Sequence, residues 1–371
     1  MPAPNPPPRL FVGVMSGTSL DGVDAALCRI DEGQFTLLGF HGIPMPDELR
    51  EMLHQLQAPS TNELDLCLRA RKLLSELYAE AIGALLSRSH VEPSQIIAAG
   101  CHGQTLRHQP GAGYTLQILD GALLSELTGM DIVCDFRSRD IAAGGQGAPL
   151  VPAFHQAIFH HPAESRAIVN IGGMANITLL PAIGGVTGFD CGPGNVLMDE
   201  WIYKAQGAHY DPAGQWGAQG SPAPALLNRL LAHPFFETSP PKSCGREDFN
   251  LSWLEGELAG ADISAADVQA TLQALTAQAI ADSIRRYGPG TRSIYICGGG
   301  ARNVALMEKL AAALHEAEVN TTEAVGLAAE CIEAAAFAWL AERHVAGAPG
   351  NLPAVTGASG PRILGALYPY K

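Results

Sequence analysis

The stretch Gly13-Val14-Met15-Ser16-Gly17-Thr18-Ser19-Leu20-Asp21-Gly22-Val23-Asp24 lies between two apolar runs near the start of the chain. It places glycines, hydroxyl groups and carboxylates in one tight turn. Glycine lets backbone N–H groups approach an anion with no Cβ in the way, and hydroxyl groups add donors. The residue types leave two interpretations open, a phosphate-binding turn and a solvated hairpin turn. In a phosphate site, the carboxylates fit only if they face Mg²⁺ or water.

Apolar runs and helical stripes alternate outward from this turn. Strands are predicted on either side of it, at Leu10–Met15 and residues 22–27. Further strands are predicted at residues 35–40, 96–99, 132–134, 167–171, 177–180 and 293–297, and helices at residues 62–88, 267–286, 304–317 and 328–343. The polar, turn-rich residues 239–247 predict a loop. The alternation indicates an α/β protein.

The start of this pattern recurs once. Residues 12–27 and 169–180 both contain a strand, a glycine-containing turn and a second strand. Hairpins with glycine are common, so chance is one interpretation. The other is a duplicated fold in which each half opens with a hairpin that faces a shared cleft.

Length and composition limit the class of protein. A chain of 371 residues is long for one core, so two domains are expected. Hydrophobic residues make up 47% and charged residues 16%, which excludes global disorder. The net charge of −14 argues against a protein that coats nucleic acid or an anionic membrane, although an acidic protein can hold a local anion site.

The cysteines and the start of the chain predict the compartment. None of the 8 cysteines forms a closely spaced pair, so a zinc knuckle is not expected, and no metal site is predicted in the protein itself. Scattered cysteines in apolar runs are typical of small core residues in a reducing compartment. The proline-rich start lacks a signal pattern, and no run of about 18 apolar residues occurs. A cytoplasmic protein is expected.

Two glycine-rich segments follow predicted strands in the second half. In Gly188-Phe189-Asp190-Cys191-Gly192-Pro193-Gly194-Asn195, Asp190 ends a strand before a rigid turn, which suits a general base. Asp190 is equally suited to cap a helix that begins near Val196. Gly298-Gly299-Gly300 offers a flat surface for an adenine or a ribose, or forms a mobile turn between strand and helix.

Polar clusters also follow the predicted strands of the first half. Cys101-His102-Gly103-Gln104-Thr105 follows one strand, and Asp135-Phe136-Arg137-Ser138-Arg139-Asp140 follows the next. Polar side chains at strand ends line clefts in α/β folds. Arg137 or Arg139 suits a substrate carboxylate, and the alternative is a local surface ion pair. His102 lacks a partner at metal-ligand spacing and is expected to be a structural or hydrogen-bonding residue.

Six motifs in fixed order carry a family resemblance. They are Gly17-Thr18-Ser19-Leu20-Asp21-Gly22-Val23-Asp24, His102-Gly103-Gln104-Thr105, Asp135-Phe136-Arg137, Asn170-Ile171-Gly172-Gly173-Met174-Ala175-Asn176-Ile177-Thr178, residues 190–195 and Thr356-Gly357-Ala358. Together they resemble the anhydro-N-acetylmuramic acid kinase family. The similarity runs from Gly13 to about Pro369.

The resemblance implies a fold and a reaction. The fold is that of sugar kinases, heat-shock protein 70 and actin, with two related α/β domains of the ribonuclease H-like type around a central ATP cleft. It implies an N-terminal domain of residues 1–136 plus 351–371 and a C-terminal domain of residues 137–350. The enzyme would use ATP, carried with Mg²⁺, and water to open the 1,6-anhydro bridge of the amino sugar. It would phosphorylate O6 to give N-acetylmuramic acid 6-phosphate, in cell-wall recycling. A homodimer without nucleic acid or membrane partners is implied.

The resemblance also implies site residues. Asp190 matches the family's catalytic base. The predicted nucleotide contacts are Gly17, Thr18, Ser19, Leu20, Asp21, Gly22, Val23, Asp24, Asn170, Gly172, Gly173, Gly298, Gly299, Gly300, Asn303 and Glu333. The predicted sugar contacts are His102, Gln104, Thr105, Arg137 and Asp140.

Two positions depart from the pattern expected of the family. Cys191 and Cys101 stand where a small hydroxyl residue is expected, and a thiol is a weaker hydrogen-bond partner. Other functions considered are an ordinary hydroxyl-phosphorylating sugar kinase, an ATP-driven conformational protein of the same fold and a binding-only module. The absence of a peptide-binding extension argues against the conformational protein.

Overall fold

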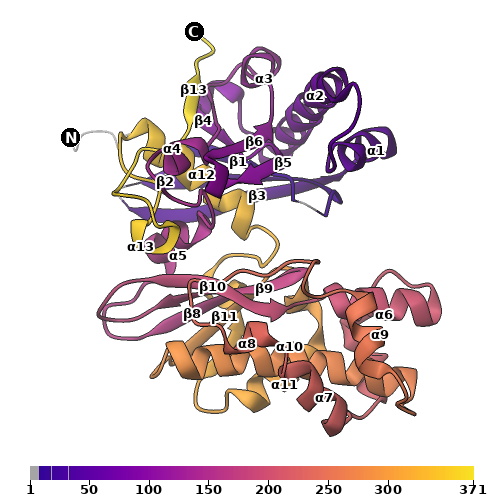
Figure 1. Cartoon of the computed structure of the whole chain (residues 1–371). Coiled ribbons are helices and arrows are strands. Elements are labelled where there is room, and N and C mark those ends of the chain that lie inside the picture. Colours follow the sequence, from indigo (N-terminus) through magenta and orange to yellow (C-terminus); the bar gives the residue numbers. More distant parts are fainter. Residues whose placement is uncertain (1–7, 18, 32) are drawn as a thin grey trace. The chain divides into compact units, whose positions relative to one another are not determined.

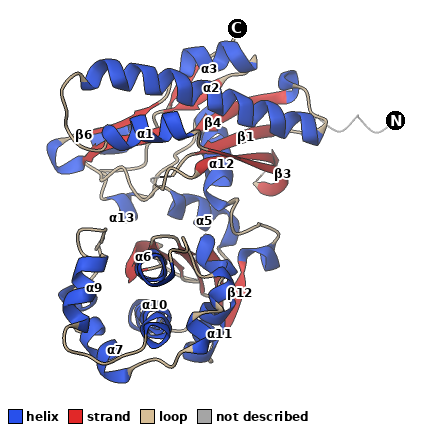
Figure 2. Cartoon of the chain, turned by 90° about the vertical axis from the view of Figure 1, so that its right-hand side faces the viewer, coloured by secondary structure: helices blue, strands red, loops and turns tan. Residues whose placement is uncertain are grey.

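The computed structural model describes residues 8–17, 19–31 and 33–371 (Figure 1). The chain divides into two compact units. Unit 1 contains the chain up to Ile158 together with Cys331–Lys371, and unit 2 contains Phe159–Glu330. Helices flank a sheet in each unit (Figure 2).

Unit 1 is built on a six-stranded sheet in the order β13-β7-β4-β1-β2-β3. Its strands are β1 (Leu10–Met15), β2 (Gly22–Asp31), β3 (Gln34–Pro44), β4 (Ile96–Cys101), β7 (Ile132–Cys134) and β13 (Ala366–Tyr368), beside a separate hairpin of β5 (Gln104–Gln109) and β6 (Tyr114–Ile118). Its helices are α1 (Asp47–Gln55), α2 (Glu63–Ser89), α3 (Gly121–Thr128), α4 (Ser138–Ala142), α5 (Val151–Phe159), α12 (Ile332–Val345) and α13 (Pro353–Thr356).

The central strand β1 is covered on both faces, because successive side chains of a strand point to opposite sides. Val12 and Val14 lie in one buried cluster with Tyr78 of α2. Gly13 points to the other face, where an added Cβ would lie 1.8 Å from the backbone oxygen of Ala334 in α12. Glycine is therefore required for the close approach of α12 to the sheet.

Unit 2 is built on a five-stranded sheet in the order β10-β9-β8-β11-β12. Its strands are β8 (Arg166–Ile171), β9 (Met174–Leu180), β10 (Thr187–Pro193), β11 (Ser293–Cys297) and β12 (Glu318–Thr321). Its helices are α6 (Val196–Gln206), α7 (Pro224–Leu231), α8 (Pro234–Glu237), α9 (Leu251–Leu258), α10 (Ala265–Tyr287) and α11 (Val304–Ala313). Leu272 and Ile280 of α10 are buried against Val169 and Ile177 of the sheet in one apolar cluster.

The two sheets repeat one topology. In unit 1 the first strand pairs antiparallel with β2, β2 pairs antiparallel with β3, and β4 and β7 continue the sheet in parallel. In unit 2 the same sequence of pairings runs through β8, β9, β10, β11 and β12. The predicted α/β class and the duplicated fold with a hairpin opening each half are confirmed.

The units divide at other positions than the predicted domains. The predicted boundaries followed residues 136 and 350, whereas the compact units divide after Ile158 and Glu330. The reason is packing within unit 1, where α12 lies against β1 and β4, and Asn351 and Thr356 donate hydrogen bonds to Asp140 beyond β7. Among the described residues, no helix is both long and apolar enough to cross a bilayer.

Candidate functional site

The turn between β1 and β2 is held to unit 1 at Ser16 and Leu20. The Ser16 hydroxyl is buried, lies 2.8 Å from the Tyr78 hydroxyl and donates to the Gly103 carbonyl at 3.2 Å. Leu20 is buried, adopts a left-handed φ of 58°, and its N–H donates to the Gly17 carbonyl at 3.2 Å. These anchors fix the path of the turn.

The predicted nucleotide residues of this turn differ in what they present to a ligand. Those with surface access are Gly17, Ser19, Asp21, Gly22 and Asp24. Leu20 and Val23 are buried in the core, so only their backbone atoms are candidates for contact. Thr18 lies outside the described residues.

His102 and Arg137, which follow β4 and β7, lie together in unit 1. The Arg137 guanidinium contacts His102 Nε2 through Nη2 at 2.9 Å and Nε at 3.2 Å, and donates from Nη1 to the Gly147 carbonyl at 2.8 Å. Burial, and secondarily the Arg137 charge, lowers the pKa of His102 to about 3. Because the neutral ring accepts at Nε2, its proton belongs on Nδ1.

The region around His102 and Gln104 contains buried polar atoms that have no hydrogen-bond partner in the described part of the chain. His102 Nδ1 and both polar side-chain atoms of Gln104 have no hydrogen-bond partner among the described residues. Gln104 is fully buried, and leaving a buried polar group unpaired costs about 1–3 kcal/mol. A bound polar ligand would satisfy these atoms. Thr105 differs, because its hydroxyl already accepts a hydrogen bond from Gln117 at 3.1 Å.

Asp140 is fully buried within unit 1. Its carboxylate accepts hydrogen bonds from the Gly147 N–H at 2.8 Å, the Asn351 amide at 2.7 Å and the Thr356 hydroxyl at 2.8 Å. The carboxylate therefore ties three chain segments together. One of them, at Gly147, also positions Arg137.

Glu333 lies in the first turn of α12, within electrostatic reach of Asp24 on β2. Loss of hydration raises the pKa of the Glu333 carboxyl, the Arg137 charge lowers it, and Asp24 raises it again. The side chain has an exposed surface, so solvent weakens these effects. Arg137 and Asp24 thus both come close enough to influence Glu333 although they are far from it in sequence.

In unit 2 the β8–β9 turn lies against the triple glycine. An added Cβ on Gly298, which has a φ of 77°, would lie 2.2 Å from Asn170 Oδ1. A Cβ on Gly300 would lie 2.3 Å from Ile171 Cγ2, whereas Gly299 is exposed. The structure therefore brings Asn170, Gly298, Gly299 and Gly300 together, as a shared nucleotide site requires.

The other predicted nucleotide contacts of unit 2, Gly172, Gly173 and Asn303, already take part in hydrogen bonds within the protein. The carbonyls of Gly172 and Gly173 accept from the N–H groups of Asn195 at 2.8 Å and Gly194 at 2.9 Å. Asn303 caps α11, since its Oδ1 accepts from the Leu306 N–H at 3.0 Å. Capping accounts for an asparagine at this position without a ligand.

Asp190 lies on β10 and is held by the loop at residues 239–247. Its Oδ2 accepts from the Cys244 N–H at 3.0 Å, and its own N–H donates to the Lys242 carbonyl at 3.2 Å. Burial raises the pKa of the Asp190 carboxyl, and the Cys244 hydrogen bond and the Lys242 charge lower it. Asp190 does not cap α6, whose N-cap residue is Asn195. A half-buried, oriented carboxylate of this kind suits a general base.

The two unexpected cysteines are buried thiols. Burial raises the pKa of Cys191 to about 12 and holds the pKa of Cys101 well above its ordinary value. Both are therefore protonated at neutral pH and are not thiolate nucleophiles. Cys191 interacts with Ser283 of α10.

The residues that hold Asp190 in place were not predicted from the sequence. Lys242 and Cys244 were assigned only to a loop. The available signal was a lysine and an arginine, Arg246, in a loop of an otherwise acidic chain. Asn351 was missed, and Thr356 was quoted within a motif but given no role.

Comparison with known proteins identifies relatives over the full length. The model of the family described as anhydro-N-acetylmuramic acid kinase matches residues 9–370. The chain is 54% identical to the anhydro-N-acetylmuramic acid kinase of Nitrosospira multiformis, over 97% of this chain and 98% of that protein. It is 50% identical to the enzyme of the same name from Pseudomonas paraeruginosa, over 97% of this chain and 98% of that protein.

Solved structures with similar chains are more distant. Component A of the Acidaminococcus fermentans (R)-2-hydroxyglutaryl-CoA dehydratase is 11% identical with a TM-score of 0.49, over 89% of this chain and 96% of that chain. A ROK family glucokinase from Streptomyces griseus, solved with glucose and AMPPNP, is 14% identical with a TM-score of 0.39, over 89% of this chain and 99% of that chain.

Proposed function

The chain belongs to the anhydro-N-acetylmuramic acid kinase family, and from this premise we infer how its residues carry out the reaction. It is an ATP-using kinase of peptidoglycan recycling. It opens the 1,6-anhydro bridge of anhydro-N-acetylmuramic acid with water and phosphorylates O6. The products are N-acetylmuramic acid 6-phosphate and ADP.

We assign the catalytic base to Asp190, and the observation that carries this assignment is its setting on β10. One carboxylate oxygen is fixed by the Cys244 N–H at 3.0 Å. The hydrogen bond orients the group, and the carboxylate retains lone pairs for a water molecule. Burial raises the pKa of this carboxyl, and the Cys244 hydrogen bond and the Lys242 charge oppose that rise.

The reaction then balances without a separate general acid. Asp190 takes a proton from water as the water oxygen bonds to the anomeric carbon C1. The bond between C1 and the bridge oxygen breaks, and that oxygen stays on C6. It bonds to the γ-phosphorus of ATP as the bond from phosphorus to ADP breaks. The proton on Asp190 passes to solvent after the product leaves.

Nucleotide binding is proposed for the two hairpin turns. In unit 1 the surface-accessible residues around Gly17 and Ser19 offer backbone N–H groups and a hydroxyl to phosphate oxygens. In unit 2 Gly298, Gly299 and Gly300 bring a surface without side chains beside Asn170. We propose that this surface receives the nucleoside.

Mg²⁺ is proposed to arrive with ATP. Among the described residues no group of three or more His, Cys, Asp or Glu side chains is arranged to hold a metal ion. Mg²⁺ at kinase sites is usually held by nucleotide phosphates and water together with one or two carboxylates. Asp24 and Glu333, close enough for Asp24 to raise the pKa of Glu333, are the carboxylates that would hold it. The cation would neutralise phosphate charge.

Sugar recognition is proposed for His102, Gln104 and Arg137. The unpaired polar atoms of Gln104 and the Nδ1 proton of His102 are matched by the hydroxyl and amide groups of an amino sugar. Burial lowers the pKa of Arg137 to about 10, so it stays charged at neutral pH and suits the acid group of the substrate. Thr105 and Asp140 remain predicted sugar contacts, although both already accept hydrogen bonds within the protein.

Homodimer formation and a cytoplasmic location are also proposed, by family resemblance. Light scattering on the purified chain tests the first. Fractionation of cells that express it tests the second.

Lys242 contributes to the pH dependence expected of Asp190, because its charge lowers the pKa of the Asp190 carboxyl. The base works only when ionised, so activity falls as pH decreases through its pKa. Replacing Lys242 with methionine removes a charge that lowers this pKa, so the acid limb of the pH profile of kcat/KM moves to higher pH. Wild type and variant converge at higher pH, where both carboxyls are ionised.

Lys204→Met is the matched control, because Lys204 is exposed and pairs with Glu255. It leaves the acid limb in place. An acid limb that does not move in Lys242→Met would contradict the role of the lysine.

The alternatives are separated by one assay. ADP release is measured with 1,6-anhydro-N-acetylmuramic acid and, in parallel, with N-acetylmuramic acid. We expect release only with the anhydro sugar. Equal ADP release with both sugars would favour a hydroxyl-phosphorylating kinase. ADP release without any sugar would favour an ATP-driven conformational protein. No ADP release under either condition would favour a binding module. The family membership does not favour these alternatives.

A further inference from the structure

A separate cavity in unit 2 lies beside the C-terminal half of α10. Its volume is about 200 Å³, and on the same measure a single water molecule needs about 10–15 Å³. The walls come from α10, the end of α7, α8 and the loop residue Lys242. Asp190 does not line it, although the Lys242 carbonyl accepts from the Asp190 N–H.

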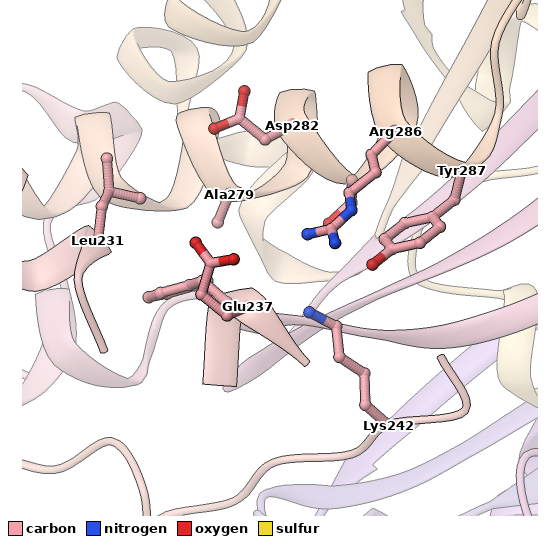
Figure 3. A pocket seen from close by; sticks show the side chains of 9 residues that line it. Leu231, Glu237, Lys242, Ala279, Asp282, Arg286 and Tyr287 are labelled. Carbon is pink, nitrogen blue, oxygen red and sulfur yellow. The ribbon is translucent and has the colours of Figure 1, made fainter. Parts of the chain in front are cut away.

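Hydrogen-bond donors from two segments converge on this cavity. Figure 3 shows the Lys242 ammonium group, the Arg286 guanidinium and the Tyr287 hydroxyl pointing toward one another across it. The Tyr287 hydroxyl is buried and has no hydrogen-bond partner among the described residues. Ser283 adds a further hydroxyl to the lining.

The two cations of the cavity have no ion pair among the described residues. Lys242 Nζ donates to the Phe235 carbonyl at 3.2 Å and lies 4.3 Å from the centroid of the Phe235 ring. Arg286 lies over the Tyr287 ring, with its Cζ 5.3 Å from the ring centroid. Loss of hydration lowers the pKa of Lys242, the neighbouring Cys191, Cys244 and Asp190 raise it, and the charge of Arg286 lowers it. The two like charges therefore disfavour one another.

The acidic residues of the lining do not cancel both positive charges. Asp282 accepts from Arg285 at 3.0 Å and from Gln278 at 2.8 Å, so its charge is already compensated. Glu237 is exposed and lies at the cavity, as Figure 3 shows. Glu237, and Asp190 acting on Lys242 from outside the lining, offset part of this positive charge. The cavity still places two cations beside a hydroxyl donor that has no partner among the described residues.

We propose that this cavity binds a small oxyanion, a phosphate or a carboxylate group, between Lys242, Arg286 and Tyr287. The anion relieves the repulsion between Lys242 and Arg286. It also accepts a hydrogen bond from the Tyr287 hydroxyl, which has no partner among the described residues. The group comes from free phosphate or from a carboxylic acid. The proposal does not depend on the role assigned to Asp190.

The test measures binding to the full chain by isothermal titration calorimetry. The probes, in separate arms, are inorganic phosphate, acetate and the anhydro sugar acid. Arg286→Gln removes the charge and Tyr287→Phe removes only the hydroxyl. Arg285→Gln is the matched control, because Arg285 is the adjacent arginine but pairs with Asp282 and does not line the cavity. Lys242 is left unchanged because it also acts on Asp190.

Saturable binding of phosphate or acetate is expected, weakened about tenfold or more in Arg286→Gln and Tyr287→Phe and unchanged in Arg285→Gln. If phosphate binds and acetate does not, the natural ligand is a phosphate. If acetate binds, the natural ligand is a carboxylic acid. Weakening confined to the sugar acid assigns the cavity to the carboxylate of the substrate. The proposal is overturned if no probe binds saturably, or if Arg286→Gln binds every probe as tightly as wild type does.

Discussion

Asp190→Asn lowers kcat by about 10²–10⁴-fold, the usual contribution of a general base. Asparagine has the same shape, and its Oδ1 can still accept from the Cys244 N–H, which lies 3.0 Å from Asp190 Oδ2. It cannot take a proton from water at neutral pH. Binding of ATP and of the anhydro sugar is therefore expected to change little, so that the loss appears in kcat and not in KM.

The measurement is steady-state ADP release together with calorimetric binding of each ligand. Asp262→Asn serves as the control, since Asp262 is exposed in the segment before α10, and it retains wild-type turnover. If Asp190→Asn turns over at a near-normal rate, the assignment of the base is lost.

Asp140→Ala destabilises the protein by about 3 kcal/mol or more, because each buried donor left without its acceptor costs about 1–3 kcal/mol. The substitution leaves the donors of Gly147, Asn351 and Thr356 without their acceptor in a fully buried position. It also frees the segment whose Gly147 carbonyl accepts from Arg137. The free energy of unfolding is measured in urea, in the absence of ligands.

Two comparison variants separate this structural role from the predicted contact with sugar. Asp140→Asn keeps an acceptor oxygen for part of the network, so its loss is smaller, about 1–3 kcal/mol. Asp262→Ala changes an exposed aspartate and stays within about 0.5 kcal/mol of wild type. Wild-type stability of Asp140→Ala would show that the network does not hold unit 1 together.

The strands of the two opening hairpins were predictable because their signals are local, whereas β5, β6, β12 and β13 were not predicted. The apolar run at Leu10–Met15 and the glycines of the turn after it determine a hairpin by themselves. The same holds for the β8–β9 hairpin. The end of α11 at Ala313 and the start of α12 at Ile332 were each set a few residues off, because tertiary contacts decide where helices end.

The long-range parts of the candidate site were not predictable from spacing. Asp140 meets Asn351 and Thr356 across more than 200 residues of chain, and a single sequence carries no record of such a contact. Asp190 was singled out correctly as a constrained strand residue, but its partner Cys244 lies 54 residues away. The division of the chain after Ile158 and Glu330 follows from similar packing of distant segments.

The proposed mechanism requires that the bond between C1 and the bridge oxygen breaks. This is tested with substrate that carries oxygen-18 in the 1,6-anhydro bridge. Attack by water at C1 leaves the label on C6, where it becomes the oxygen that joins C6 to phosphorus. We predict full retention of the label at that position in N-acetylmuramic acid 6-phosphate, detected by mass spectrometry and by the isotope shift in the phosphorus-31 spectrum. Loss of the label from the phosphate ester, or a phosphorylated sugar with its bridge intact, would contradict the account.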